Sequence, residues 1–414
     1  MSVEIIDTLV VGGGQAGLAM SEHLSRHGID HLVLERHRIA ERWRTERWDS
    51  LVANGPAWHD RFPSMEFSDV GPDAFPSKES VTSYFEQFAE QMNVPIRCGV
   101  EVLSVEKTAD ESGFFVETSK GSIHARSVVA ATGPFQKPSI PPLVPEQDGL
   151  TQMHSTAYRN PEQLSQGAVL VVGAGSSGAQ IAEELVTSGR DVYLSVGRHG
   201  RPARSYRGKD FVWWHGALGR WQLKAPPAGA EHVTIAVSGA NGGNTVDFRR
   251  FAANGMSLVG ITQSFENGVL RFAPDLAENI AKGDEDYLLM LDEADAYIAC
   301  EGLDFPEEPE AREIGPKPDC VRNPILELDL AKAGITTIIW ATGFEQNFDW
   351  LKVDAFDAQG KPNHEKGVSS EPGVYFLGLP WLSMRGSSFI WGVWLDAEYL
   401  GAHIATARRL DVAV

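Results

Sequence analysis

The chain carries the same glycine-rich pattern twice, and this repeat limits its fold more than any other feature. In TLVVGGGQAGLAMSEHLSRHGIDHLVLER, an apolar strand leads into a glycine turn, a helix and a second strand. The pattern returns as LVVGAGSSGAQIAEELVTSGRDVYLSVGR, at a constant offset of 161 residues. The paired glycines are Gly12, Gly14 and Gly17 in the first copy and Gly173, Gly175 and Gly178 in the second. Each copy is typical of a dinucleotide-binding βαβ unit. We therefore predict an α/β fold with two Rossmann-like domains, the second inserted in the first.

Each glycine of the pattern has a physical task. The first makes the tight turn, the second lets the backbone approach a pyrophosphate, and the third lets helix and strand pack closely. The phosphates then lie at a helix N-terminus, where backbone N–H groups and the helix dipole favour anions. We expect the residues that open the two helices, Gln15, Ser176 and Ser177, to join these phosphate sites.

The two copies differ where the second strand ends. Glu35 closes the first copy and can accept hydrogen bonds from ribose hydroxyls. The same offset lands on Val196 in the second copy, with Arg198 just beyond. A guanidinium is a natural bidentate partner for a 2′-phosphate, and Arg201 and Arg204 are expected to reinforce it. The second site therefore favours NADPH, with NADH as the alternative if Arg198 is only a solvated loop charge.

Two such sites in one chain suggest FAD in the first and a nicotinamide reductant on the second. Two apolar strands each run into Ala-Thr-Gly, at Ala131, Thr132 and Gly133 and again at Ala341, Thr342 and Gly343. We expect these turns to mark where the chain crosses between the domains and approaches a ligand. The predicted FAD domain is 1–146 with 335–414, and the predicted NAD(P)H domain is 147–334 with an insertion at about 200–330.

The end of the chain predicts a strand, an irregular segment that includes Ser388, and a helix starting near Trp391. The N-terminus of that helix is expected to face the flavin and stabilise its reduced anion through the helix dipole. A closing helix that merely packs is the alternative.

The composition restricts the classes of molecule that the chain is expected to bind. A formal net charge of -20 argues against nucleic acid and anionic lipid as partners. The cysteines Cys98, Cys300 and Cys320 lie far apart, which predicts neither a disulfide framework nor a dithiol centre. No apolar run approaches a membrane span, and the first strand begins at Ile5, leaving no room for a cleavable leader. We expect a cytoplasmic protein with no metal site.

Beyond these features, the chain resembles the class B flavoprotein monooxygenases, which include the flavin-containing, N-hydroxylating and Baeyer–Villiger enzymes. The likeness covers the order of motifs, except at roughly 200–330. In ERWRTERWDSLVANGPAWHDRFP, the resemblance places Trp43 against the isoalloxazine and Asn54 at the active-site asparagine. In DGLTQMHSTAYRN, His154 and Tyr158 match the family fingerprint, but its phenylalanine and glycine positions are not kept. The resemblance further implies FAD contacts at Arg36, Arg42 and Val102.

The resemblance implies that NADPH reduces FAD and that oxygen then adds to form a C4a-hydroperoxyflavin, which oxygenates a small organic substrate. An amine or a sulfide is favoured and a ketone is an alternative. The rival hypotheses are a flavin reductase that passes electrons to a quinone or another acceptor, and a nucleotide sensor without turnover. The aromatic run of the insertion, with Phe211, Val212, Trp213, Trp214 and Trp221, is expected to line a substrate tunnel, form a homodimer contact or pack in a core.

Overall fold

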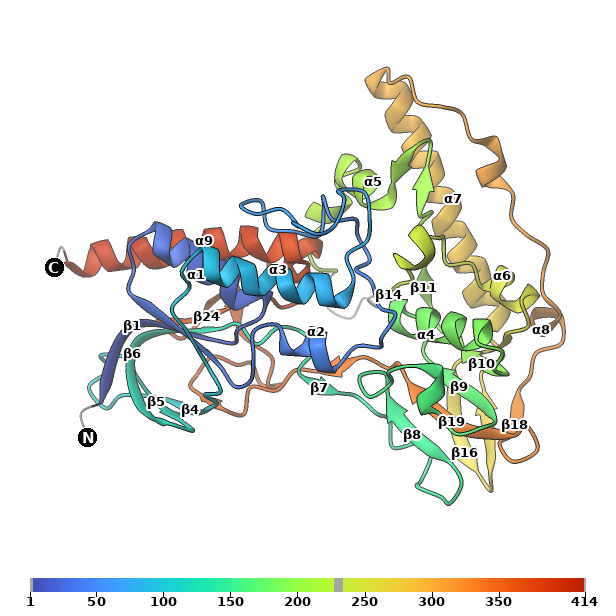
Figure 1. The fold of residues 1–414 in the computed structure, drawn as a ribbon, viewed down its shortest axis with the longest axis horizontal. Coiled ribbons are helices and arrows are strands. Elements are labelled where there is room, and N and C mark those ends of the chain that lie inside the picture. Colours follow the sequence, from blue (N-terminus) through green and yellow to red (C-terminus); the bar gives the residue numbers. More distant parts are fainter. Residues whose placement is uncertain (1–2, 227–233, 413–414) are drawn as a thin grey trace.

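The computed structural model describes residues 3–226 and 234–412, so part of the predicted insertion, 227–233, lies outside the described residues. The described chain forms two large sheets joined by a narrow connection (Figure 1). Each copy of the glycine-rich pattern lies in one of these two sheets, which is why the fold has two sheets of this kind. The predicted α/β class with two nucleotide-binding units is confirmed.

The first sheet is built around β1, which pairs in parallel with β2 and β6. The last residues of β6 also pair in parallel with β24, while its first residues pair antiparallel with β5. Helices α1 and α9 pack together, and with α3 they lie on one side of the sheet (Figure 1). The strands are β1 (Glu4–Val11), β2 (His31–Glu35), β3 (Ile96–Cys98), β4 (Val102–Lys107), β5 (Phe114–Thr118), β6 (Gly121–Ala130), β21 (Leu351–Lys352), β22 (His364–Glu365), β23 (Val368–Ser369) and β24 (Val374–Phe376). The helices are α1 (Gln15–Arg26), α2 (Glu41–Thr45), α3 (Lys78–Gln91) and α9 (Ile390–Val412).

The second sheet is parallel throughout, in the order β15-β10-β9-β19-β8. Its strands β9 and β19 are buried and largely apolar because a parallel sheet is covered on both faces. The strands are β8 (Thr151–His154), β9 (Ala168–Val172), β10 (Val192–Ser195), β15 (Ser257–Val259) and β19 (Ile335–Trp340). The helices of this half are α4 (Ser176–Thr187), α5 (Phe211–Ala217), α6 (Phe248–Ala253), α7 (Leu276–Glu301) and α8 (Asp319–Arg322).

Smaller elements complete the second half. An antiparallel sheet joins β16 (Thr262–Glu266), β17 (Val269–Phe272) and β18 (Glu327–Asp329). The turn between β16 and β17 has positive φ at Asn267 and Gly268, as the Asn-Gly pair predicts for a tight hairpin. The remaining strands are β11 (His199–Gly200) with β14 (Thr234–Ile235) and β12 (Ser205–Tyr206) with β13 (Lys209–Asp210). The 3-10 turns are η1 (Pro161–Gln163), η2 (Arg220–Gln222), η3 (Ala240–Gly242), η4 (Pro309–Arg312) and η5 (Arg385–Ser388).

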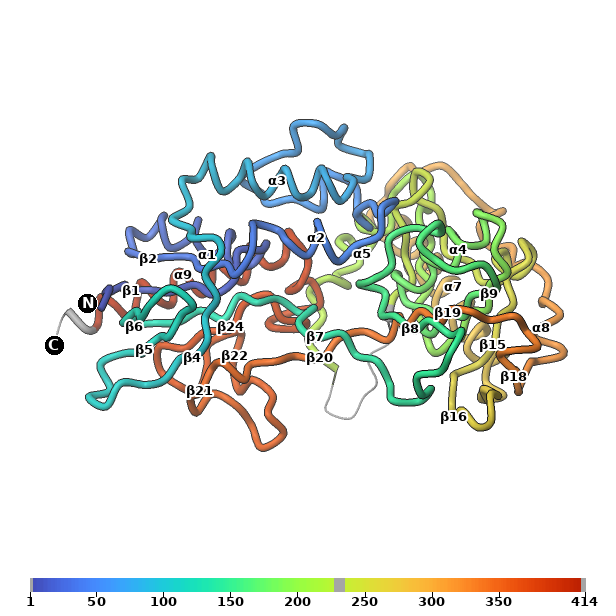
Figure 2. The backbone as a smooth tube through the Cα atoms, turned by 60° about the horizontal axis from the view of Figure 1, so that its bottom comes forward, coloured from blue at the N-terminus to red at the C-terminus, as the bar shows by residue number. Residues whose placement is uncertain are grey.

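The two halves are joined where β7 (Lys137–Pro138) pairs antiparallel with β20 (Phe344–Glu345). Figure 2 shows these two strands side by side between the sheets. Each follows one Ala-Thr-Gly turn, so both turns lie at the crossing, as expected. The predicted domain limits need two corrections. Residues 335–340 form β19 of the second sheet, not part of the first domain. Strand β15, inside the predicted insertion, also belongs to the second sheet.

Candidate functional site

A cavity of about 1200 Å³ runs from the first glycine turn to the junction of the two halves. It collects most of the residues predicted from the sequence. Those that line it are Gly12, Gly14, Gln15, Glu35, Arg36, Arg42, Trp43, Asn54, Val102, Ala131, Thr132, Gly133, Ser176, Ser177 and Ser388. The predicted residues outside its wall are Gly17, Gly173, Gly175, Gly178, Arg198, Arg204, Ala341, Thr342 and Gly343.

The cavity reaches the N-termini of two helices, one from each half. Gly14 precedes α1 and Gly175 precedes α4, both in extended conformation, and neither helix has a side-chain cap. A Cβ at Gly14 would have no atom within 4 Å, so the backbone there faces open space. Uncapped N–H groups at a helix start favour anions. Gly14 of the first helix and Ser176 and Ser177 of the second line the same cavity, so it borders both helix starts.

The outer glycines of each turn are fixed by packing. Gly12 has φ +116° and a Cβ there would lie 2.6 Å from the Ala131 carbonyl oxygen. Gly173 has φ +103° and a Cβ there would lie 2.5 Å from the Ala341 carbonyl oxygen. The two Ala-Thr-Gly turns are therefore equivalent: each alanine closes over the first glycine of its own unit. A Cβ at either third glycine, Gly17 or Gly178, would lie 1.8 Å from the carbonyl oxygen of the first.

At the end of β2, the Glu35 carboxylate accepts backbone N–H groups from Gly13 at 2.7 Å and His37 at 2.8 Å. These bonds hold the carboxylate at the cavity wall, where it can accept ribose hydroxyls. In the second unit, Val196 is buried at the matching position. Arg198 follows as an exposed residue just past β10, outside the cavity wall.

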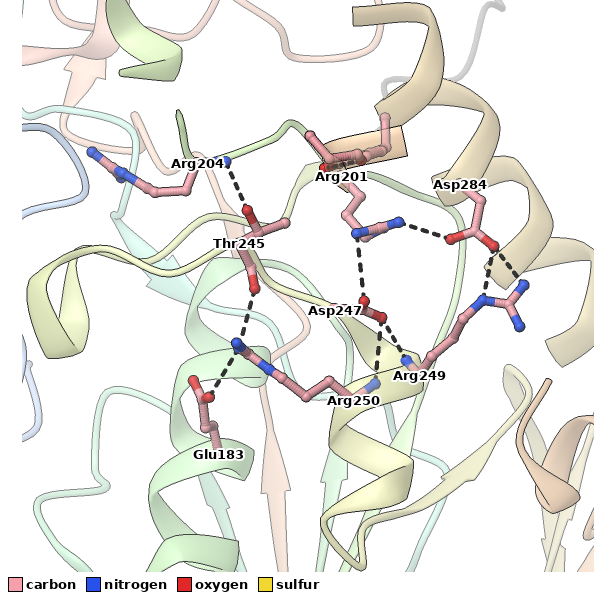
Figure 3. A network of polar contacts seen from close by, with 10 residues as sticks. Glu183, Arg201, Arg204, Thr245, Asp247, Arg249, Arg250 and Asp284 are labelled. Carbon is pink, nitrogen blue, oxygen red and sulfur yellow. Dashed lines mark hydrogen bonds and ion pairs between the residues drawn. The ribbon is translucent and has the colours of Figure 1, made fainter. Parts of the chain in front are cut away.

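Arg201 and Arg204 do not have the role predicted for them. Both side chains are buried, and Figure 3 shows Arg201 between Asp247 and Asp284, with the Arg204 backbone bound to Thr245. The Arg201 guanidinium donates to Asp284 at 2.9 Å and lies over the Tyr287 ring, and Arg249 binds the other oxygen of Asp284. Arg204 pairs with Asp210 at 2.6 Å and donates to the Asn54 carbonyl at 2.6 Å. These arginines are satisfied inside the protein, so neither is available to a 2′-phosphate.

Asn54 lies where the two halves meet. Its side-chain oxygen accepts an N–H from Gln180 of α4 at 2.9 Å. Gln180 is buried and also donates to the Val237 carbonyl at 2.7 Å. The Asn54 side chain is therefore held at the cavity wall by a residue of the second unit. Sequence reasoning missed Gln180, although a glutamine among the apolar residues of α4 was a signal.

Arg47 is a second residue that the sequence analysis missed. It lines the cavity, and its guanidinium lies over the rings of Phe135 and Trp43, at 5.1 and 5.7 Å. Its hydrogen bond goes to the Glu46 carbonyl at 3.0 Å. Burial lowers the pKa of Arg47 to about 10, still far above neutrality. This charge at the cavity wall suits a phosphate or a carboxylate.

His154 joins the fingerprint segment to the second Ala-Thr-Gly turn. Its Nε2 donates to the Gly343 carbonyl at 3.0 Å, and its Nδ1 accepts the Thr156 backbone N–H at 3.2 Å. Burial lowers its pKa, which favours this neutral form. Tyr158 is buried and donates to Glu184 at 2.6 Å. Both matched residues therefore make hydrogen bonds within the protein, His154 to the second Ala-Thr-Gly turn and Tyr158 to α4.

The N-terminus of α9 borders the cavity. Ser388, Phe389 and Ile390 line the wall, and the Gln15 amide donates to the Ser388 carbonyl at 2.8 Å. Asp60 lies in the same wall, where its carboxylate accepts the Gly55 N–H at 2.9 Å and pairs with His59 at 2.7 Å. The helix begins at Ile390, one residue before the predicted start.

Comparison with known families and proteins agrees with this geometry. Residues 9–210 match the family described as pyridine nucleotide-disulphide oxidoreductase. An uncharacterized CzcO-like oxidoreductase of Geobacillus kaustophilus is 35% identical over 402 residues, covering 96% of this chain and 97% of that protein. The indole-3-pyruvate monooxygenase YUCCA1 of Oryza sativa is 32% identical over 44% of this chain and 45% of that protein.

Solved structures share the whole fold. The flavin-containing monooxygenase of Stenotrophomonas maltophilia superposes with a TM-score of 0.66 at 20% identity, over 98% of this chain and 99% of that one. A cyclohexanone monooxygenase superposes with a TM-score of 0.59 at 16% identity, over 99% of this chain and 89% of that one. Within residues 3–226 and 234–412, no helix is both long and apolar enough to cross a membrane.

Proposed function

Because this chain belongs to the family of CzcO-like oxidoreductases and shares the fold of flavin-containing monooxygenases, we propose that it binds FAD and NADPH and oxygenates a small organic molecule. The observation that carries the proposal is the single cavity that reaches both uncapped helix N-termini. Two dinucleotides whose pyrophosphates lie at these ends would meet at the junction between the halves.

The residues of the first unit fit FAD. The Gly14 backbone and the start of α1 face open space for a pyrophosphate, and Glu35 is held at the wall for a ribose. The start of α9 also lines the cavity, beside Gln15 at the start of α1, and its dipole would stabilise negative charge on a reduced flavin. Bound there, FAD would take a hydride from NADPH and activate oxygen.

The chain's own part is to position the two cofactors and to keep water out. With its side-chain oxygen engaged by Gln180, Asn54 would donate its amide N–H groups to the reacting oxygen or to the nicotinamide. The neutral amide adds no charge that would protonate the reacting group. Arg198 would bind the 2′-phosphate of NADPH, whereas Arg204 supports Asn54 from behind. Amines and sulfides, as soft nucleophiles, are the favoured substrates.

A reductase that transfers electrons without oxygen is the main rival. A disulfide-reducing branch is not favoured, because none of Cys98, Cys300 and Cys320 lines the cavity. A quinone or another soluble acceptor would fit the same cavity.

A stopped-flow measurement separates the two. The FAD-loaded protein is reduced anaerobically with NADPH and mixed with oxygenated buffer while the flavin spectrum is recorded. A monooxygenase gives a band at shorter wavelength than oxidised FAD that persists before the oxidised spectrum returns. Immediate return of oxidised FAD, together with fast reduction of an added quinone and no oxygenated product, would favour the reductase instead.

A further inference from the structure

Arg47 is a charged residue of the cavity wall that the proposed function leaves unused. Its guanidinium lies over the rings of Trp43 and Phe135, at 5.7 and 5.1 Å. A guanidinium carries five N–H donors, yet within the described part of the chain Arg47 makes one hydrogen bond, to the Glu46 carbonyl. The carboxylate of Glu46 pairs with Arg42 instead. Arg47 therefore has donors to offer to an anion in the cavity.

The charge of Arg47 is retained although the group is partly removed from water. Burial lowers its pKa to about 10, so the guanidinium stays protonated at neutral pH. Burying a charge costs free energy unless a partner compensates it, and aromatic rings compensate only part of that cost. Two other cations of the same wall do have carboxylate partners: Arg42 pairs with Glu46, and Lys137 pairs with Glu345 at 3.5 Å. A bound anion would complete the environment of Arg47 in the same way.

The segment that carries Arg47 is attached to the second half of the molecule, although it follows the first glycine-rich unit in sequence. The next residue, Trp48, is buried in the same apolar cluster as Ala174 of the second glycine turn. The Ser50 hydroxyl donates to Glu184 of α4 at 2.6 Å. The backbone beside Arg47 is thus fixed against the second unit.

The neighbours of Arg47 lead to the edge of the second sheet. The Phe135 ring lies 5.0 Å from the Phe344 ring, and Phe344 lies 5.0 Å from the ring of His154, the last residue of β8. Burial and, to a lesser extent, the charge of Arg47 lower the pKa of His154, so these two groups are close. Because β8, β19 and β9 are parallel, their carboxyl ends share this edge. Ligands of such sheets bind outside the carboxyl ends.

From this arrangement we propose that Arg47, a residue of the first half, binds the pyrophosphate of the nicotinamide dinucleotide held by the second half. The proposal rests on the proposed binding of NADPH at the start of α4, where Ser176 and Ser177 line the same cavity as Arg47. A guanidinium can donate two parallel N–H groups to phosphate oxygens. The helix start from one half and the guanidinium from the other would together hold the pyrophosphate.

This role differs from the one proposed for Arg198 in a way that can be measured. The 2′-phosphate distinguishes NADPH from NADH, whereas the pyrophosphate is common to both. Arg47 would therefore act on the two dinucleotides equally, and Arg198 would act on NADPH alone. A ligand that has the 2′-phosphate but no pyrophosphate would depend on Arg198 and not on Arg47.

Binding to the oxidised, FAD-loaded full chain tests the proposal without turnover. NADP⁺, NAD⁺ and adenosine 2′-monophosphate, which lacks a pyrophosphate, are titrated by calorimetry. In Arg47→Gln, the Kd values for NADP⁺ and NAD⁺ should each rise by about 10- to 100-fold, as expected when a hydrogen bond to a charged group is lost. The Kd for adenosine 2′-monophosphate should not change. Arg198→Ala should instead weaken NADP⁺ and adenosine 2′-monophosphate and leave NAD⁺ unchanged.

Arg44→Gln is the matched control, because it removes the same charge from α2. Arg44 pairs with Glu86 at 2.5 Å and is not among the residues that line the cavity. It should bind all three ligands as the wild type does. Equal weakening in Arg44→Gln and Arg47→Gln would mean that net charge alone is responsible, and unchanged binding of NADP⁺ in Arg47→Gln would also overturn the proposal.

Arg47→Lys separates the charge from the paired donors. It keeps a cation over the two rings, so it takes the place of Arg47→Gln if that variant folds poorly, and it should weaken NADP⁺ and NAD⁺ alike by a smaller factor. Folded Arg47→Lys protein that has lost FAD would assign the guanidinium to the first cofactor instead. Wild-type protein that binds no NADP⁺ would contradict the proposed function, whereas normal binding in the wild type and in both Arg47 variants would contradict the role of Arg47 alone.

Discussion

The two nucleotide-binding units are built alike at their glycine turns and differently at the ends of their second strands. In both, an alanine carbonyl of an Ala-Thr-Gly turn closes over the first glycine, at 2.6 Å from the hypothetical Cβ in one unit and 2.5 Å in the other. In the first unit, Glu35 caps the Gly13 N–H, and a Cβ at Gly13 would lie 2.8 Å from the Glu35 Cβ. The second unit has Ala174 and Val196 at these positions.

This difference separates what the fold needs from what the ligand needs. The outer glycines are required by contacts within the protein, so both units keep them. The Glu35 carboxylate at the end of β2 requires a glycine at position 13 beside it. The second unit has neither the acid nor this glycine. A strand end without a carboxylate neither binds an unmodified ribose in the same way nor repels a 2′-phosphate. The structure of the turn is thus shared, and the choice of dinucleotide depends on a few side chains.

The largest effect is expected from replacing Gly17 or Gly178, the last glycine of the pattern in each unit. Gly17→Ala and Gly178→Ala each place a Cβ 1.8 Å from a backbone oxygen, so strand and helix must separate. We expect Gly17→Ala to yield protein without FAD. Gly178→Ala should retain FAD but lose at least about a hundredfold in its rate of reduction by NADPH, a change of about 2.7 kcal/mol. Flavin content and anaerobic reduction rates measure both.

The matched control is the middle glycine of the first turn. A Cβ at Gly14 meets nothing within 4 Å, so Gly14→Ala should fold normally and weaken FAD binding only through its contact with the pyrophosphate. If Gly178→Ala lost FAD as completely as Gly17→Ala does, the two units would not be separable and the comparison would fail.

The next largest effect is expected on nucleotide binding, from replacing Arg198 just past the end of β10. Arg198→Ala is expected to raise the KM for NADPH by about 10- to 100-fold and to leave the KM for NADH almost unchanged. A hydrogen bond to a charged group contributes about 1.5 to 3 kcal/mol, which sets this range. Arg271→Ala, an exposed arginine on β17 paired with Glu327, serves as the control. Equal changes for both nucleotides would remove Arg198 from the phosphate site.

The sequence alone predicted the repeated features well, because they depend on local geometry. The glycine turns and the crossing at the two Ala-Thr-Gly turns each need particular backbone angles or close contacts. Strand β19 was assigned to the wrong half because an apolar strand carries no mark of the sheet that it joins.

The sequence does not show which side chains become partners when distant parts of the chain come together in the fold. Arg198, Arg201 and Arg204 look alike in GRHGRPARS, yet two of them are buried against Asp284 and Asp210. Those acids are brought near only by the folded chain. The same applies to Gln180, whose partner Asn54 belongs to the other half of the molecule.

A smaller effect tests the contact between the units. Asn54→Ala should retain FAD and NADPH oxidation but release peroxide in place of product, because the amide donors are lost. Gln180→Ala should cause the same uncoupling to a lesser degree, since Asn54 would remain but lose its orientation. Peroxide formed per NADPH consumed is the measurement. Wild-type coupling in Asn54→Ala would remove this residue from the reaction, and uncoupling in Gln180→Ala alone would assign it to that glutamine.

The smallest effect compares buried histidines in the two halves. His23 on α1 and His215 on α5 are both buried, and burial lowers the pKa of His23 to about 4 and of His215 to about 3. In the unfolded chain each would take up a proton near pH 6.5, so the unfolded state binds more protons below that pH. Each neutral histidine therefore contributes stability that is present above pH 6.5 and is lost as the pH falls from 6.5 toward the folded-state value.

His215→Phe isolates the contribution of the second half. For one such histidine, the free energy of unfolding should fall by about 1.4 kcal/mol between pH 7.5 and pH 5.5. The variant should lose that part of the pH dependence, and the difference between two pH values cancels any constant cost of the larger ring between Phe211 and Trp221. Urea unfolding at the two pH values measures it, with the exposed His403→Phe as control. An unchanged slope in His215→Phe but a reduced one in His23→Phe would mean that the first half alone limits stability in acid, which would sharpen the contrast between the units.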